Sequence, residues 1–160
     1  MDGTTLVDII KESIFVILTL LVFLSYAMFR GRQALVNLIM GLYFALLISL
    51  NFPYYHLITS SGDAKSQSFM MIVVFAIFTT GSTILFGRLM PREYAETPFE
   101  GFWKKLAFAL AATILVMTYS YHTLPITELV NPGSPMQWLF AAPQSFFWWL
   151  LAPLLILFIL

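Results

Sequence analysis

Residues 69–86 read FMMIVVFAIFTTGSTILF and contain no charged side chain. A helix needs about 20 predominantly apolar residues to cross the hydrocarbon core of a bilayer. Lipid offers no hydrogen-bond partner to the backbone, so each N–H and C=O must be satisfied inside the segment, as it is in a helix. This stretch therefore predicts a membrane-spanning helix.

Other stretches of the chain have the same character. Residues 13–29, 34–52 and 106–121 are also free of charged side chains. Residues 138–160 carry no charge either, but Pro143 and Pro153 interrupt them and Phe146 opens a run of four aromatic residues that is typical of a membrane interface. This last stretch either crosses the membrane as a fifth helix or enters it only part of the way as a hairpin.

The composition supports a membrane protein. Hydrophobic residues make up 60% of the 160 residues and charged residues 10%, whereas about 25% are charged in an average soluble domain. A soluble fold of this size would leave several apolar faces in water. The predicted fold is a single all-α domain over residues 1–160: a polytopic membrane helix bundle with four spans and a fifth at the C-terminus.

The charged residues and the cysteine count exclude several classes of function. The net charge is zero and no helix carries the basic face that a nucleic-acid backbone requires, so no nucleic-acid partner is expected. The chain has no cysteine, which excludes disulfides, thiolate metal sites and a cysteine nucleophile.

The distribution of lysine and arginine predicts how the chain is oriented. Short cytoplasmic loops are enriched in these residues. Six of the eight basic residues fall in the connections that follow the first and third apolar stretches: Arg30, Arg32, Arg88, Arg92, Lys104 and Lys105. We therefore expect the 30–33 and 87–105 loops in the cytoplasm and the N-terminus outside.

Small and weakly polar residues predict where helices meet. They recur on one face of the second apolar stretch at a spacing of four, and a comparable face follows on the third, and such residues let two helix backbones approach closely. These faces predict packing within the chain, and they suit an interface between copies equally well. The residues are Asn37, Gly41, Ala45 and Ser49, then Ala76, Thr80, Thr83 and Gly87.

No pattern in the sequence predicts catalysis. No phosphate-binding loop, dinucleotide fingerprint or nucleophile elbow occurs, so no catalytic residue, cofactor or metal ligand is assigned. His56 and His122 lack partners at ligand spacing, and aromatic-rich helix ends account for both; a histidine-ligated redox centre is the less favoured alternative.

One polar run lies in the middle of a predicted span. The hydroxyl side chains could line a narrow aqueous path after oligomerisation, although hydroxyls in membrane helices commonly bond to their own backbone. The residues of this run are Thr79, Thr80, Ser82 and Thr83.

The first hairpin resembles the colicin V production protein family of bacterial inner-membrane proteins. The resemblance rests on Asp8, then an apolar helix, then Arg30–Gly31 and Gln33–Ala34–Leu35 opening the next helix, and it covers about the first 55 residues. It implies an accessory protein of the bacterial inner membrane, linked to envelope maintenance and to export of peptide toxins, and it supplies no catalytic residues.

These observations favour a non-enzymatic inner-membrane accessory protein whose partners are the lipid bilayer and either copies of itself or other membrane proteins. The alternative is a small channel or transporter subunit with the polar run 79–83 along its path. The sequence names neither a ligand nor a partner protein.

Overall fold

A computed structural model describes residues 3–55, 64–90, 101–122, 140 and 142–160. Over these residues the fold is all-helical and contains no strand. Apolar residues without a two-residue alternation give the chain helices rather than strands, and lipid exposure would favour the same outcome. The five helices are α1 (Gly3–Arg30), α2 (Arg32–Leu50), α4 (Ala64–Leu89), α5 (Phe102–His122) and α8 (Pro143–Ile159).

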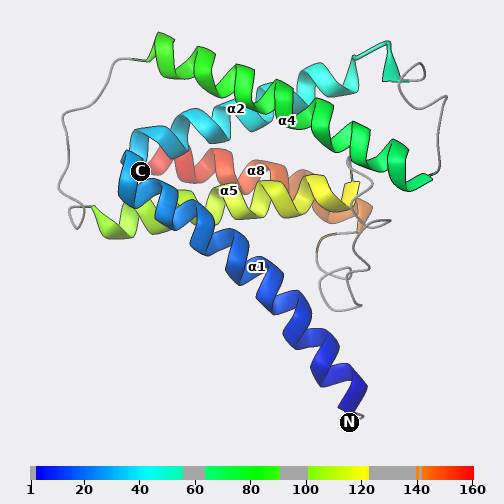
Figure 1. The fold of residues 1–160 in the computed structure, drawn as a ribbon. Helices are drawn as coiled ribbons and strands as arrows, with labels where there is room; N and C mark the ends of the chain where they lie inside the picture. The colour runs from blue at the N-terminus through cyan, green and yellow to red at the C-terminus, as the bar shows by residue number, and fades with distance from the viewer. Residues whose placement is uncertain (1–2, 56–63, 91–100, 123–139, 141) are drawn as a thin grey trace.

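Successive helices run in opposite directions (Figure 1). The end of α1, the start of α2, the end of α4, the start of α5 and the end of α8 lie at one end of the bundle, and the other helix ends lie opposite. The basic residues Arg30, Arg88 and Lys104 therefore share one end. We call it the basic end.

One residue, Gly31, separates α1 from α2. Its N–H donates to the Ala27 carbonyl at 2.9 Å, and its φ of 83° with ψ of 168° lies in a region that is almost exclusive to glycine. The absence of a Cβ lets the chain reverse direction without a loop. α1 is then splayed away from the other helices toward its N-terminus (Figure 1).

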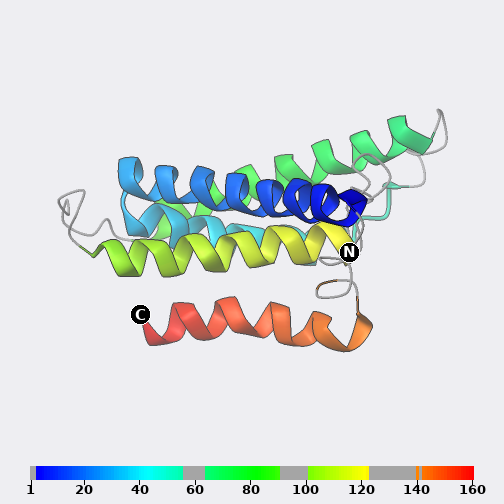
Figure 2. The same cartoon turned by 90° about the horizontal axis from the view of Figure 1, so that it is seen from below.

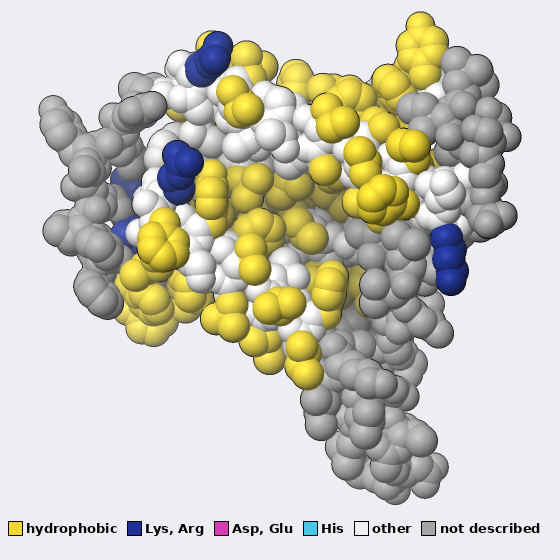
Figure 3. All heavy atoms as spheres, in the orientation of Figure 1, with side chains coloured by type: hydrophobic (Ala, Val, Ile, Leu, Met, Phe, Trp, Pro, Cys, Tyr) yellow, Lys and Arg dark blue, Asp and Glu magenta, His cyan; other side chains and the backbone are white. Residues whose placement is uncertain are grey.

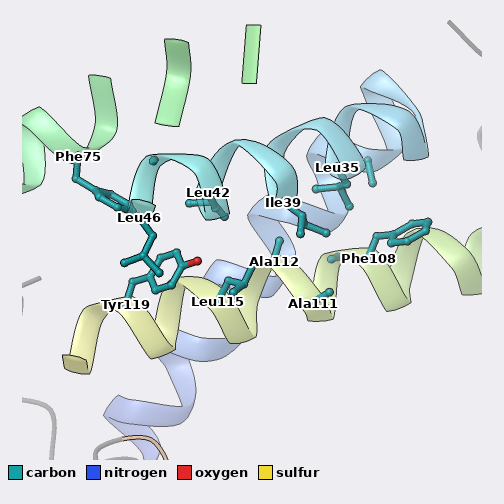
Figure 4. Packing of buried hydrophobic residues seen from close by; sticks show 13 residues of the cluster. Leu35, Ile39, Leu42, Leu46, Phe75, Phe108, Ala111, Ala112, Leu115 and Tyr119 are labelled. Carbon is teal, nitrogen blue, oxygen red and sulfur yellow. The ribbon is translucent and has the colours of Figure 1, made fainter. Parts of the chain in front are cut away.

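Helix α5 is the centre of the bundle and packs against α1, α2 and α8. Its small side chains Ala109, Ala111 and Ala112 are fully buried, so neighbouring backbones come close. Larger side chains from α2 and α5 fill the remaining space, among them Leu35, Ile39, Leu115 and Tyr119 (Figure 4).

Helix α8 forms a layer of its own beneath the other four helices (Figure 2). Pro143 is at its first turn, where the missing N–H costs nothing, and Pro153 is buried within it. The helix packs on α5, and the Tyr43 hydroxyl of α2 donates a hydrogen bond to its Leu150 carbonyl.

The structure supports the membrane prediction for three helices rather than four. α2 (19 residues), α4 from Lys65 (25 residues) and α5 (21 residues) are long and apolar enough to cross a bilayer. The apolar part of α1 with described side chains, Ile14–Arg30, is shorter than this, and so is Ser145–Ile159 of α8. Proline at position 143 starts α8 five residues later than the predicted stretch 138–160. A helix of 17 residues spans about 25 Å, less than the roughly 30 Å of a hydrocarbon core.

Candidate functional site: the α2–α4 contact and the outward face of α4

Two helices approach each other closely at Gly41 of α2. A Cβ placed on Gly41 would lie 2.9 Å from the backbone nitrogen of Thr83 and 3.1 Å from its Cα. Nothing larger than hydrogen fits there, so the two helices meet backbone to backbone. A Cβ on Gly87, one turn further along α4, would lie 3.5 Å from the Asn37 side chain.

The small-residue face predicted for α2 is buried along its whole length. Asn37, Gly41, Ala45 and Ser49 are all buried, and α4 is the main neighbour of α2. Polar members of the face also have partners: the Ser49 hydroxyl is 2.5 Å from the Tyr55 hydroxyl. This face is therefore used inside the chain.

A polar cluster lies at the basic end of the α2–α4 contact. The Gln33 Nε2 donates to Asn37 Oδ1 at 3.3 Å and contacts the Met90 sulfur at 3.4 Å. Because Gln33 and Asn37 belong to α2 whereas Met90 follows α4, this amide joins the start of α2 to the end of α4. The contact with Met90 is the one that crosses between the helices, and a thioether sulfur is a weak acceptor, whereas the bond to Asn37 lies within α2.

The corresponding face predicted for α4 divides. Thr83 lies against α2, and Gly87 is exposed but lies beside the Asn37 side chain of α2. Ala76 and Thr80 are exposed. The residues of α4 that are buried are Ser68, Phe75 and Ser82, at a spacing of seven. The buried side of α4 follows this seven-residue series, so for Ala76 and Thr80 the other role expected from the sequence, an interface between copies, stays a prediction.

The outward face of α4 is therefore open and partly made of small residues. Ala76, Thr80 and Gly81 are exposed, and a Cβ on Gly81 would meet no atom within 4 Å. Large apolar side chains, Ile77 and Ile84, are exposed beside them. α2 is the one helix with which α4 makes an extensive contact.

The hydroxyls of the polar run 79–83 are mostly turned to their own helix. Thr79 donates to the Phe75 carbonyl at 2.9 Å, Thr80 to Ala76 at 2.8 Å and Thr83 to Thr79 at 2.7 Å. Ser82, the fourth residue of the run, is buried while Thr80 is exposed, so the run does not line one common surface. Each threonine bond satisfies its hydroxyl without water.

The histidine that the structure describes is part of an aromatic cluster. The His122 Nε2 lies 2.5 Å from the Phe140 carbonyl oxygen, and its ring centroid is 4.5 Å from that of Phe146. These contacts join the end of α5 to the start of α8. His56 lies outside the described residues, and within the described ones no three His, Cys, Asp or Glu side chains gather at a distance suited to a metal ion.

Two tyrosines in the core escaped the sequence reasoning. Tyr43 bonds to α8, and Tyr119, only 1% exposed, has no hydrogen-bond partner for its hydroxyl among the described residues. The ring of Tyr119 contacts Phe75 at 5.8 Å between centroids. No signal in the sequence points to the Tyr43 contact, because its partner Leu150 lies 107 residues further along the chain.

Fold and site together define an all-helical protein in which three helices can cross a membrane and one helix keeps an open face of small residues. No family model, curated protein or solved structure matches the chain.

Proposed function

We propose that this chain is a non-enzymatic multi-pass membrane protein that associates with copies of itself, or with other membrane proteins, through the outward face of α4. The observation that carries the proposal is the position of Ala76 and Thr80, which are small, exposed and on the helix with one extensive neighbour. In lipid, helices associate through close packing of small residues, because the lipid chains are as apolar as the side chains.

In this proposal all five helices cross the bilayer, and local thinning of the lipid accommodates the shorter α8. The N-terminus is outside, and the 30–33 and 87–105 loops are in the cytoplasm. The bias of lysine and arginine supports this orientation. The similarity of the first hairpin to the colicin V production protein family supports a bacterial inner membrane and an accessory role in envelope maintenance or toxin export. The one-residue turn at Gly31 is compatible with that hairpin.

Cysteine cross-linking tests the proposed interface, and the absence of native cysteine makes each introduced thiol unique. We expect Ala76→Cys to form disulfide-linked dimers on mild oxidation in native membranes. Leu154→Cys, on the exposed side of α8, is the control and should remain monomeric. Equal cross-linking at both positions would indicate random collision and contradict the proposed face.

A second test enlarges the face without touching the α2–α4 contact. Thr80→Leu places a larger side chain on the exposed side of α4 and should weaken association, whereas Ile84→Leu keeps the volume of an exposed side chain and should not. The measurement is the mass of the purified protein in mild detergent. A wild-type protein that is strictly monomeric and purifies without any other protein would overturn the proposal.

A further inference from the structure

Three exposed basic side chains at the basic end each stand next to an exposed apolar side chain. Arg30 follows Phe29, Arg88 precedes Leu89 and Lys104 follows Trp103. The three apolar neighbours are 89%, 68% and 78% exposed, respectively. The pairs come from three different helix ends: the last residues of α1, the last of α4 and the first of α5.

The opposite end of the bundle has a different surface. Among the side chains that are described there, Lys65 is the one lysine or arginine, although exposed aromatic residues such as Tyr54, Phe147 and Trp148 are present. On the face drawn in Figure 3, most of the dark blue basic side chains lie at the left, which is the basic end, and hydrophobic side chains cover the middle. Aromatic residues occur at both membrane–water interfaces, whereas pairs of a basic and an apolar residue favour a membrane surface that is negatively charged.

The charges in the sequence have the same bias. Residues 30–33 and 87–105 include six basic and three acidic residues, whereas the rest of the chain includes two basic and five acidic residues. The zero net charge of the chain is therefore the sum of positively and negatively charged segments.

We propose that the basic end is a binding surface for the headgroups of anionic phospholipids, formed by Arg30, Arg88 and Lys104. The apolar neighbours Phe29, Leu89 and Trp103 enter the boundary between headgroups and acyl chains, which holds each cation at the level of the lipid phosphates. Lys105 is buried and does not belong to this surface. The proposal does not depend on self-association through α4, and the α4 variants leave it untouched.

The test compares lipids around the full-length protein reconstituted in phosphatidylcholine vesicles. Spin-labelled phosphatidylglycerol and spin-labelled phosphatidylcholine report the association of each lipid with the protein surface. We expect the wild type to select phosphatidylglycerol several-fold. Each Lys or Arg near an anionic headgroup contributes about 1 kcal/mol, which corresponds to roughly fivefold in association. Arg88→Gln combined with Lys104→Gln should lower the selectivity to the contribution of Arg30 alone.

Lys65→Gln is the matched control, because it removes one positive charge from the opposite end and should leave the selectivity unchanged. Equal association of the two lipids with the wild type would overturn the proposal, and so would a Lys65→Gln effect as large as that of Arg88→Gln. If the double variant does not fold, high salt applied to the wild type provides the same test, since screening should lower the selectivity. Loss of selectivity on adding millimolar inorganic phosphate at constant ionic strength would indicate a site for free anions and overturn a lipid surface.

Discussion

Gly41 of α2 and Thr83 of α4 pack backbone against backbone, with only 2.9 Å between the Thr83 nitrogen and the position that a Cβ on Gly41 would take. The helix pair α2–α4 depends on that missing side chain. Around the same crossing, Asn37 contacts Gly87 and Gln33 reaches Met90, so one interface combines close packing with hydrogen bonds.

Gly41→Ala should therefore destabilise the protein. Inserting a methyl group into a tightly packed contact costs about 1–3 kcal/mol, because backbone atoms of Thr83 must move apart. The free energy of unfolding in mixed detergent micelles measures the effect. Gly81→Ala on α4 is the control, since its Cβ meets no atom and alanine favours a helix over glycine by about 1 kcal/mol. A Gly41→Ala variant as stable as Gly81→Ala would contradict the close approach.

Gly31→Ala tests the turn between α1 and α2. A Cβ on Gly31 would meet no atom within 4 Å, so a clash with other residues is not expected to destabilise the variant. The φ of 83° with ψ of 168° predicts a loss of about 1–3 kcal/mol, because an alanine in that conformation is strained. Thermal unfolding of the purified protein distinguishes the two outcomes. Gly87→Ala, with an ordinary 3.5 Å contact and no positive φ, should be tolerated.

Tyr43→Phe removes the hydrogen bond from α2 to the Leu150 carbonyl of α8. The expected loss is about 1 kcal/mol, and it should fall mainly on the docking of α8. The measurement is the rate of thiol labelling at the buried position 153. The reference is Pro153→Cys alone, and labelling should be faster when Tyr43→Phe is added to it. An unchanged labelling rate would show that α8 does not depend on this bond.

Tyr119→Phe should behave in the opposite way. The hydroxyl of Tyr119 is buried without a described partner, and a buried unpaired polar group costs about 1–3 kcal/mol. Removing it should leave the free energy of unfolding unchanged or raise it, while the ring contact with Phe75 is retained. A loss of stability as large as that of Tyr43→Phe would mean that the Tyr119 hydroxyl is bonded.

His122→Phe tests the aromatic cluster that joins α5 to α8. The ring contact with Phe146 can persist, whereas the hydrogen bond to the Phe140 carbonyl is lost. We expect a loss of about 1 kcal/mol in the free energy of unfolding and no change in bound metal or colour. A coloured wild-type protein that loses its colour in this variant would instead establish a histidine-ligated cofactor.

The helical class could be predicted from the sequence because charge-free apolar stretches leave the backbone no other way to satisfy its hydrogen bonds in lipid. The packing face of α2 was readable as well, since its small residues recur every four positions. On α4, however, both Ala76 and Ser82 are small, and lipid and protein interior are equally apolar, so composition does not reveal which of the two residues faces inward. Ser82 is buried and Ala76 is exposed.

The ends of the helices were less predictable than their centres. α4 begins at Ala64, before the apolar stretch that starts at residue 69, because polar residues such as Lys65 and Gln67 continue a helix without contributing to hydropathy. The contacts of Tyr43 with Leu150 and of His122 with Phe140 join residues far apart in the chain, and no local pattern encodes them.

The separate layer formed by α8 has a consequence for biosynthesis. α8 is the last of the five helices to leave the ribosome, and the surface of α5 that receives it is by then already in place. Until α8 arrives, that surface and the Tyr43 hydroxyl face lipid or another protein. The newly made protein therefore passes through a four-helix stage in which its central helix is open to any partner that reaches it first.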